Sequence, residues 1–257
     1  MISRQDIDSL FDLSGRVAIV TGGSRGIGRA IAEGFAAAGA KVVVASRKAE
    51  ACQEVASALE AAGHEALAVP THMGDLDAVA NLAKATADRF GQIDIVVNNA
   101  ANALALPMGQ VTPDAFDKSF AVNVRGPLFL VQHALPHLEK SEHASVINVI
   151  SAGVFTSAQF VGLYAAGKSA LRTLTRSMAH EFAPRNIRVN AIAPGTVDTD
   201  MVRNNDPAVQ AAMRDAAPVK RMASPNELVG MALYLASDAG SFATGQTFIV
   251  DGGMTTS

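Results

Sequence analysis

A glycine-rich turn between two regular segments constrains the fold of this 257-residue chain more than any other feature. The segment RVAIV at 16–20 has the apolar, β-branched composition of a buried strand, and RAIAEGFAAAG at 29–39 has the composition of a helix. Only TGGSRGIG, at 21–28, lies between them. A strand, a glycine turn and a helix in this order are typical of a dinucleotide-binding unit, because the helix N-terminus offers free N–H groups to a pyrophosphate.

Three glycines of this turn have separate roles in that prediction. Gly22 permits the tight turn, Gly26 lets the backbone approach the pyrophosphate, and Gly28 allows close packing of the helix on the strand. Glycine turns that bind no ligand are common, so the turn alone is weak evidence. The strand before it and the helix after it favour the binding interpretation.

The rest of the chain repeats the alternation of strand and helix. Further strands are predicted at 41–46, 65–70, 93–100, 145–150, 186–195 and 245–253. Helical segments are predicted at 48–63, 75–91, 111–140, 160–183 and 224–238. The alternation predicts an α/β fold, a doubly wound parallel sheet of about seven strands with helices on both faces. No linker divides the chain, so we expect a single domain over 1–257, with an N-terminal arm at 1–13 and a substrate lid at 196–222.

Two side chains four residues apart, Tyr164 and Lys168, are the leading candidates for chemistry. On a helix they share one face, and Ser151 directly follows the apolar run at 145–150. A strand end and a helix turn bring a hydroxyl, a phenol and an ammonium into one crevice, which suits proton transfer to an oxygen. We expect the lysine charge to lower the tyrosine pKa below its ordinary value of about 10. The alternative is that Tyr164 packs at a core edge and Lys168 is solvated.

Asn123 is a further candidate, because it lies in the apolar stretch FAVNV within a helical segment that Thr112 caps. A buried asparagine is usually a satisfied structural group. The functional alternative is that it kinks the helix and holds a water molecule.

Composition excludes several classes of protein. The formal net charge is −3, and no basic stretch would bind nucleic acid or a membrane surface. The single cysteine, Cys52, excludes an internal disulfide and fits a reducing compartment. The first ten residues lack the apolar core of a signal peptide, and no apolar run approaches the roughly 20 residues of a transmembrane helix. We therefore expect a soluble, cytoplasmic protein with no nucleic-acid or membrane partner and no metal site.

Six motifs in register resemble those of the short-chain dehydrogenase/reductase family. They are TGxxxGxG at 21–28, Asn98-Asn99-Ala100 with Asn123, Ser151, Tyr164-x-x-x-Lys168, Pro194-Gly195 and DGG at 251–253. The resemblance extends from about residue 14 to residue 253 and implies a Rossmann-type fold. Two positions depart from the family pattern. Ala101 stands where glycine is common, and His72 with Met73 stands where many members have an adenine-binding aspartate.

The resemblance implies a role for each matched residue. Tyr164 is the general acid in carbonyl reduction, Lys168 binds the nicotinamide ribose, and Ser151 holds the carbonyl oxygen. Asn123 anchors a water molecule that links Lys168 to solvent. The residues expected to bind the cofactor are Gly22, Ser24, Arg25, Gly26, Ile27, Gly28, Ser46, Arg47, His72, Met73, Asn99, Ala100, Ala101, Tyr164, Lys168, Pro194, Gly195, Val197 and Thr199.

The end of the second predicted strand decides between NAD and NADP. An acidic residue there would bind the ribose 2′-hydroxyl and repel a 2′-phosphate, whereas arginine accommodates the phosphate. The chain has Ser46 and Arg47 at this place, and Arg25 lies in the glycine turn. Each arginine alone is more often a solvated surface residue. Together they predict that NADP(H) is preferred over NAD(H).

The leading hypothesis is an NADPH-dependent carbonyl reductase with a small, mainly apolar ketone or aldehyde substrate. The segments expected to line the substrate side, at 103–108, 153–155 and 159–163, carry no charge. Part of the chain also resembles the peroxisomal-type carbonyl, dicarbonyl and retinal reductases. The alternatives are a 3-oxoacyl-thioester reductase, which would use Arg185 in a basic docking face, and a non-catalytic cofactor-binding regulator. Apolar surface on the helices at 112–138 and 160–183, which family members pair between subunits, predicts a homotetramer.

Overall fold

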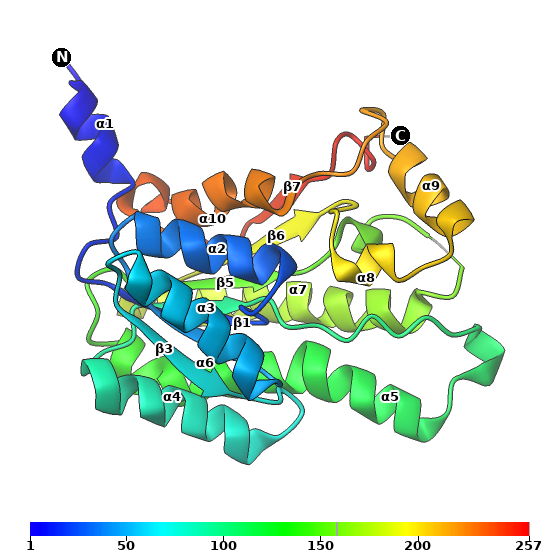
Figure 1. Ribbon diagram of the computed structural model, residues 1–257, viewed down its shortest axis with the longest axis horizontal. Helices are drawn as coiled ribbons and strands as arrows, with labels where there is room; N and C mark the ends of the chain where they lie inside the picture. Colours follow the sequence, from blue (N-terminus) through cyan, green and yellow to red (C-terminus); the bar gives the residue numbers. More distant parts are fainter. Residues whose placement is uncertain (158, 257) are drawn as a thin grey trace.

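One parallel sheet organises the computed structural model, which describes residues 1–157 and 159–256 (Figure 1). Its strand order is β3-β2-β1-β4-β5-β6-β7. The strands are β1 (Val17–Thr21), β2 (Lys41–Ser46), β3 (Ala66–Pro70), β4 (Ile95–Asn98), β5 (Ser145–Val149), β6 (Arg188–Pro194) and β7 (Thr247–Val250). The chain leaves β1 toward one edge through β2 and β3, and returns to its other side with β4. A crevice for a ligand forms at such a switch point, outside the carboxyl ends of β1 and β4.

Helices cover both faces of this sheet, which confirms the predicted fold class (Figure 1). The helices are α1 (Arg4–Leu10), α2 (Gly26–Ala37), α3 (Ala49–Ala61), α4 (Leu76–Phe90), α5 (Pro113–Phe120), α6 (Gly126–Leu138), α7 (Gly162–Phe182), α8 (Asp200–Arg203), α9 (Pro207–Asp215) and α10 (Val229–Ala236). One hydrophobic cluster joins the sheet to α2, α3 and α10, and a second joins it to α4, α6 and α7.

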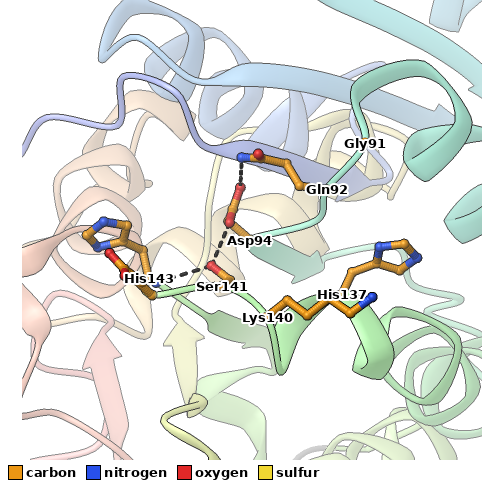
Figure 2. Close-up of a pocket in the computed structure, with 8 residues that line it drawn as sticks. Gly91, Gln92, Asp94, His137, Lys140, Ser141 and His143 are labelled. Carbon is orange, nitrogen blue, oxygen red and sulfur yellow. Dashed lines mark hydrogen bonds between the residues drawn. The ribbon is translucent and has the colours of Figure 1, made fainter.

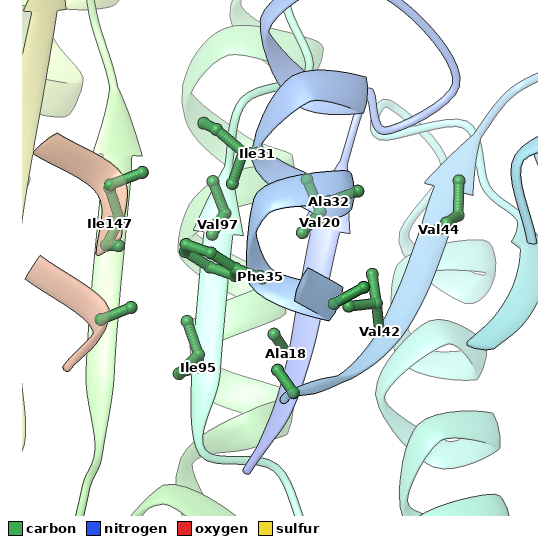
Figure 3. Close-up of a cluster of buried hydrophobic side chains, with 14 of the residues drawn as sticks. Ala18, Val20, Ile31, Ala32, Phe35, Val42, Val44, Ile95, Val97 and Ile147 are labelled. Carbon is green, nitrogen blue, oxygen red and sulfur yellow. The ribbon is translucent and has the colours of Figure 1, made fainter. Parts of the chain in front are cut away.

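The central strands are buried on both sides because helices cover both faces of the sheet. All five residues of β1 are buried, and so are all five of β5. Figure 3 shows the first cluster, in which Phe35 of α2 packs over Ile95 and Val97 of β4. Phe35 has no solvent-exposed surface, so its replacement by alanine would cost about 3–5 kcal/mol of stability. These strands hold the carboxyl edge rigidly in place.

Two segments differ from the sequence prediction. The N-terminal arm contains the helix α1, which Ser3 and Asp6 begin with a reciprocal capping box. The long helical segment after β4 is divided by one wide π-helical turn, at 121–125, between α5 and α6. Thr112 caps α5 as expected, since its hydroxyl accepts the Ala115 N–H at 3.1 Å. The wide turn contains Asn123.

The segment at 196–222 forms the two short helices α8 and α9, beyond the carboxyl edge of the sheet (Figure 1). The following helix was predicted at 224–238. It begins as a 3₁₀ turn over Pro225–Leu228 and becomes α-helical only as α10. Ser224 and Glu227 form the expected capping box at its start. In the described residues, none of the helices has the length and apolar character that crossing a bilayer requires.

Candidate active site

A large cleft of about 2480 Å³ lies along the carboxyl edge of the sheet. It extends from the glycine turn after β1, past the ends of β4 and β5, to α8 and α9. The cleft is lined by every residue that the sequence analysis proposed for catalysis or cofactor binding, except Gly28 and Asn123. The topology therefore brings together side chains from six separate parts of the chain.

Ser151, Tyr164 and Lys168 meet where β5 ends and α7 begins. Ser151 follows the last residues of β5 and caps a 3₁₀ turn, with its Oγ accepting the Gly153 N–H at 3.1 Å. Tyr164 lies in the first turn of α7, and Lys168 lies one turn later. Lys168 is 1 % exposed, and its Nζ donates to the Val149 carbonyl at 2.7 Å. The Lys168 Nζ is 5.9 Å from the centre of the Tyr164 ring.

The pKa values of this pair contradict one expectation. Burial raises the pKa of the Tyr164 phenol to about 12, and hydrogen bonding with the Ser151 hydroxyl offsets only part of that shift. Burial also lowers the pKa of Lys168 to about 8. The prediction that Lys168 brings the tyrosine pKa below 10 is wrong for the protein by itself. Burial destabilises the charged phenolate more than the hydrogen bond with Ser151 stabilises it. Tyr164 therefore stays protonated at neutral pH and can donate its proton.

Asn123 uses its amide to fasten a loop. Its Oδ1 accepts the Asn102 N–H at 3.0 Å, and its Nδ2 donates to the Asn102 carbonyl at 2.8 Å and to Ser119 Oγ at 3.2 Å. The side chain is fully buried. These contacts fit the structural alternative, because they hold the segment that follows β4 against the π-helical turn. The water-anchoring role stays a prediction.

The glycine turn leaves no room for a side chain at Gly22 or Gly28, which fits the close approach of a dinucleotide pyrophosphate to the backbone. A Cβ on Gly22, whose φ is +66°, would lie 2.7 Å from Asn99 Nδ2. A Cβ on Gly28 would lie 2.3 Å from the Gly22 carbonyl oxygen, so Gly28 allows the start of α2 to pack on its own turn. Asn99 in turn donates to the Thr21 carbonyl at 2.9 Å. The turn thus presents the N-terminus of α2 to the cleft, where phosphate is favoured.

The end of β2 is polar and cationic. Ser46, Arg47 and Lys48 line the cleft here, and Lys48 was not selected from the sequence. The Ser46 hydroxyl lies 3.2 Å from the buried Cys52 Sγ. Arg25 lies 3.2 Å from a carboxylate of α8, measured from its Nη1 to Asp200 Oδ2, and its role toward the cofactor stays a prediction.

Both departures from the family pattern, His72 with Met73 and Ala101, line the cleft. His72 and Met73 both line it, and Met73 is buried. The ring Nδ1 of His72 accepts the Gly74 N–H at 3.1 Å. Thr71, a further lining residue, was missed by the sequence analysis. Ala101 also faces the cleft, without a positive φ that would demand glycine.

The wall that α9 contributes to the cleft is apolar. The face of α9 that lines it carries Val209, Ala212, Met213 and Ala216, which are spaced as one helical stripe. Met254, near the C-terminus, contributes a side chain that sequence reasoning missed. The described lining residues at 103–105, 151–165, 201–216 and 254 carry no charge, whereas Asp117, Lys118, Arg125 and Asp200 also line the cleft and are charged. Phe155, which was expected to line it, instead packs against the Arg172 guanidinium at 4.8 Å.

A second, smaller pocket of about 220 Å³ lies before the amino end of β4 (Figure 2). Asp94 is 5 % exposed and accepts the Val17 N–H at 2.8 Å, the Gln92 side chain at 2.7 Å and the Ser141 hydroxyl. His143 contacts Asp238 at 3.1 Å. The carboxylate of Asp94 thus joins three chain segments.

Known proteins resemble this chain over nearly its whole length. The family model described as enoyl-(acyl carrier protein) reductase matches residues 22–255. An uncharacterized oxidoreductase of Mycobacterium tuberculosis is 40% identical over 250 residues, which is 96% of this chain and 94% of that protein. The 3-oxoacyl-(acyl-carrier-protein) reductase of rhamnolipids biosynthesis from Pseudomonas aeruginosa is 36% identical, over 95% of this chain and 97% of that protein. The solved Pseudomonas aeruginosa RhlG/NADP active-site complex has a TM-score of 0.90 and 35% identity, and covers 96% of this chain and 99% of its own.

The fold, the cleft and these relatives together define an α/β oxidoreductase that uses NAD(P). More narrowly, the chain belongs to the short-chain dehydrogenase/reductase family, as its motifs predicted.

Proposed function

We propose that this enzyme reduces a carbonyl group on a small, mainly apolar substrate with NADPH. The observation that carries the proposal is the apolar wall that α9 contributes to the cleft that Tyr164 also lines. A charged sugar acid would need a cation against its carboxylate to replace its hydration, and the described residues of this wall offer none. The segment at 196–222 serves as the substrate lid, because its helix α9 turns an apolar stripe toward the cleft.

Tyr164 is the general acid in this proposal. When bound, the nicotinamide supplies the hydride, and this chain supplies the proton and the electrostatic environment. Ser151 orients the carbonyl oxygen, and the Tyr164 hydroxyl donates its proton where negative charge develops. Lys168, held by the Val149 carbonyl, keeps a positive charge near that oxygen at neutral pH, since its pKa is about 8.

The pKa of Tyr164 suits the proton-donating role that carbonyl reduction needs near neutral pH. A phenol with a pKa of about 12 is almost entirely protonated at pH 7 and is ready to donate. Oxidation of an alcohol needs the phenolate as base, and below the pKa the phenolate fraction rises about tenfold for each unit of pH. The oxidation rate is therefore expected to rise with pH more steeply than the reduction rate.

Cations at the end of β2 support NADPH as the cofactor. Arg47 and Lys48 line the cleft beside the Ser46 hydroxyl, and no carboxylate side chain stands at the end of this strand. In the described part of the chain, no acidic side chain lies within ion-pairing distance of Arg47. A guanidinium in this position suits a phosphate, which it binds through two parallel hydrogen bonds. The NADP-bound relative supports the same cofactor.

The second candidate is a 3-oxoacyl-thioester reductase, which the Pseudomonas aeruginosa relative favours by its name. A carrier protein is acidic and would require free cations near the cleft. Arg185 is not free, because it lies 2.9 Å from Glu139 and 3.9 Å from Glu181. This pairing favours free carbonyl substrates. A non-catalytic regulator ranks below both, since each catalytic position is filled.

A panel of uncharged ketones, diketones, acetoacetyl-thioesters and sugar acids, assayed with NADPH and NADH, tests the proposal. Turnover with uncharged ketones and NADPH is expected. Arg47→Ala should weaken NADPH by roughly 1.5–3 kcal/mol and leave NADH nearly unchanged. Arg89→Ala, an exposed arginine on α4, is the matched control. If Arg47→Ala weakens both cofactors equally, or if only sugar acids turn over, the proposal is wrong.

We also propose a cytoplasmic homotetramer. Three of the exposed large apolar side chains are Phe116 of α5, Phe242 of the loop before the edge strand β7, and Ile249 of β7 itself. Contacts between subunits would cover such apolar surfaces. Light scattering at micromolar concentration tests the assembly, and a monomeric mass would contradict it.

A further inference from the structure

We propose that Asp200 competes with the cofactor's 2′-phosphate for Arg25, and so selectively weakens the binding of NADPH. This inference rests on the proposed function, because it takes NADPH to be a ligand of the cleft. It gives Asp200, a residue of the lid, a role in cofactor selectivity.

The first observation is the ion pair that joins the glycine turn to the lid. Arg25 directly precedes α2, and Asp200 is the first residue of α8, 175 positions further along the chain. The Arg25 Nη1 lies 3.2 Å from Asp200 Oδ2, and both residues line the cleft. The guanidinium is thus already engaged by a carboxylate at the wall where the cofactor would lie.

The start of the lid, at Thr199, also lies close to the glycine turn. The Thr199 methyl group lies 3.0 Å from the position of a Cβ on Gly26, whose φ is +55°. Thr199 and Asp200 together therefore rest on two successive residues of the glycine turn. The backbone that carries Asp200 therefore lies next to the glycine turn, within reach of Arg25.

The ion pair is weak enough to be exchanged. The Arg25 and Asp200 side chains are 67% and 48% exposed, and solvent screens such pairs strongly. A 2′-phosphate carries about twice the charge of a carboxylate and offers three acceptor oxygens, so it competes effectively for the guanidinium. NADH has no 2′-phosphate and leaves the pair intact. Only NADPH must displace Asp200 from Arg25. The affinity for NADPH, and not that for NADH, should therefore rise when Asp200 loses its charge.

The test is a titration of nicotinamide fluorescence with NADPH and with NADH, on the wild-type protein and on Asp200→Asn. We expect Asp200→Asn to bind NADPH roughly two- to fivefold more tightly, the range that an exposed ion pair provides. The affinity for NADH should not change. Asp198→Asn is the matched control, because it removes a carboxylate two positions away that pairs with Arg203 at 2.7 Å.

The Arg25→Ala background separates competition from simple repulsion. If Asp200 acts through Arg25, the Asp200→Asn substitution has no effect on NADPH binding in that background. If the gain persists there, Asp200 repels the phosphate directly and the competition is refuted. Equal changes for both cofactors, or no change for NADPH, would also refute it. Failure of the proposed function gives a different result, because Arg47→Ala would then affect both cofactors alike.

Discussion

Both ends of the sheet carry buried or half-buried ionisable groups, but these groups differ in how many hydrogen-bond partners the chain gives them. At the amino end, the Asp94 carboxylate accepts three hydrogen bonds from the chain. At the carboxyl end, the Lys168 ammonium has a single protein acceptor, the Val149 carbonyl, among the described residues. Burial also holds the pKa values of Tyr164 and Lys168 away from their ordinary values. A polar group with a full set of partners stabilises the fold, whereas one with few partners is available for chemistry.

The largest expected effect separates the two ends directly. Tyr164→Phe removes the phenolic proton and keeps the ring, so kcat for carbonyl reduction should fall by at least about 100-fold. The free energy of unfolding should stay within about 1 kcal/mol of the wild type, because only one hydroxyl is lost. Steady-state kinetics and urea unfolding measure the two quantities. Near-normal turnover would remove Tyr164 from the proposed mechanism.

The opposite result is expected at the amino end. Asp94→Ala leaves the Val17 N–H and the Ser141 hydroxyl without their acceptor, and should lower the free energy of unfolding by roughly 2–4 kcal/mol. Under conditions where the variant is folded, kcat should equal that of the wild type. Ser141→Ala, which removes one donor and leaves the other two, is the milder control. If Asp94→Ala is as stable as the wild type but inactive, the amino end serves activity rather than stability, and the comparison is wrong.

The smallest effect is a pH dependence within the carboxyl end. Lys168 has a pKa of about 8 in the folded chain, below its unfolded value of about 10.4. Burial of the charged ammonium therefore lowers the free energy of unfolding the most below pH 8. That cost declines as pH rises from 8 toward 10.4, because the folded chain releases the proton first. The stability of wild type relative to Lys168→Met should therefore increase by about 1 kcal/mol between pH 6 and pH 9. Urea midpoints at the two pH values measure this difference, and a constant difference would contradict the lowered pKa.

Much of the fold could be predicted because its signals are local. The strand β2 begins and ends where the run KVVVAS does, and the capping residues Thr112 and Ser224 stand where expected. The helix α1 was not predicted, because none of its residues is buried and it therefore carries no extended apolar periodicity, although Ser3 and Asp6 form its capping box. The hydrogen bonds that Asn123 makes with the backbone of Asn102 could not be predicted locally, since Asn102 lies in another segment.

The sequence by itself determined the family, the sheet with its two helical layers, and the residues that gather at the carboxyl edge. Strand and helix periodicity, and the glycines of the turn, act over a few residues and are readable along the chain. The tertiary structure alone decided the high pKa of Tyr164, the partner of Arg25 and the apolar stripe of α9 beside Met254. Desolvation and ion pairing depend on distances between residues far apart in sequence, such as Arg25 and Asp200, and only folding determines those distances.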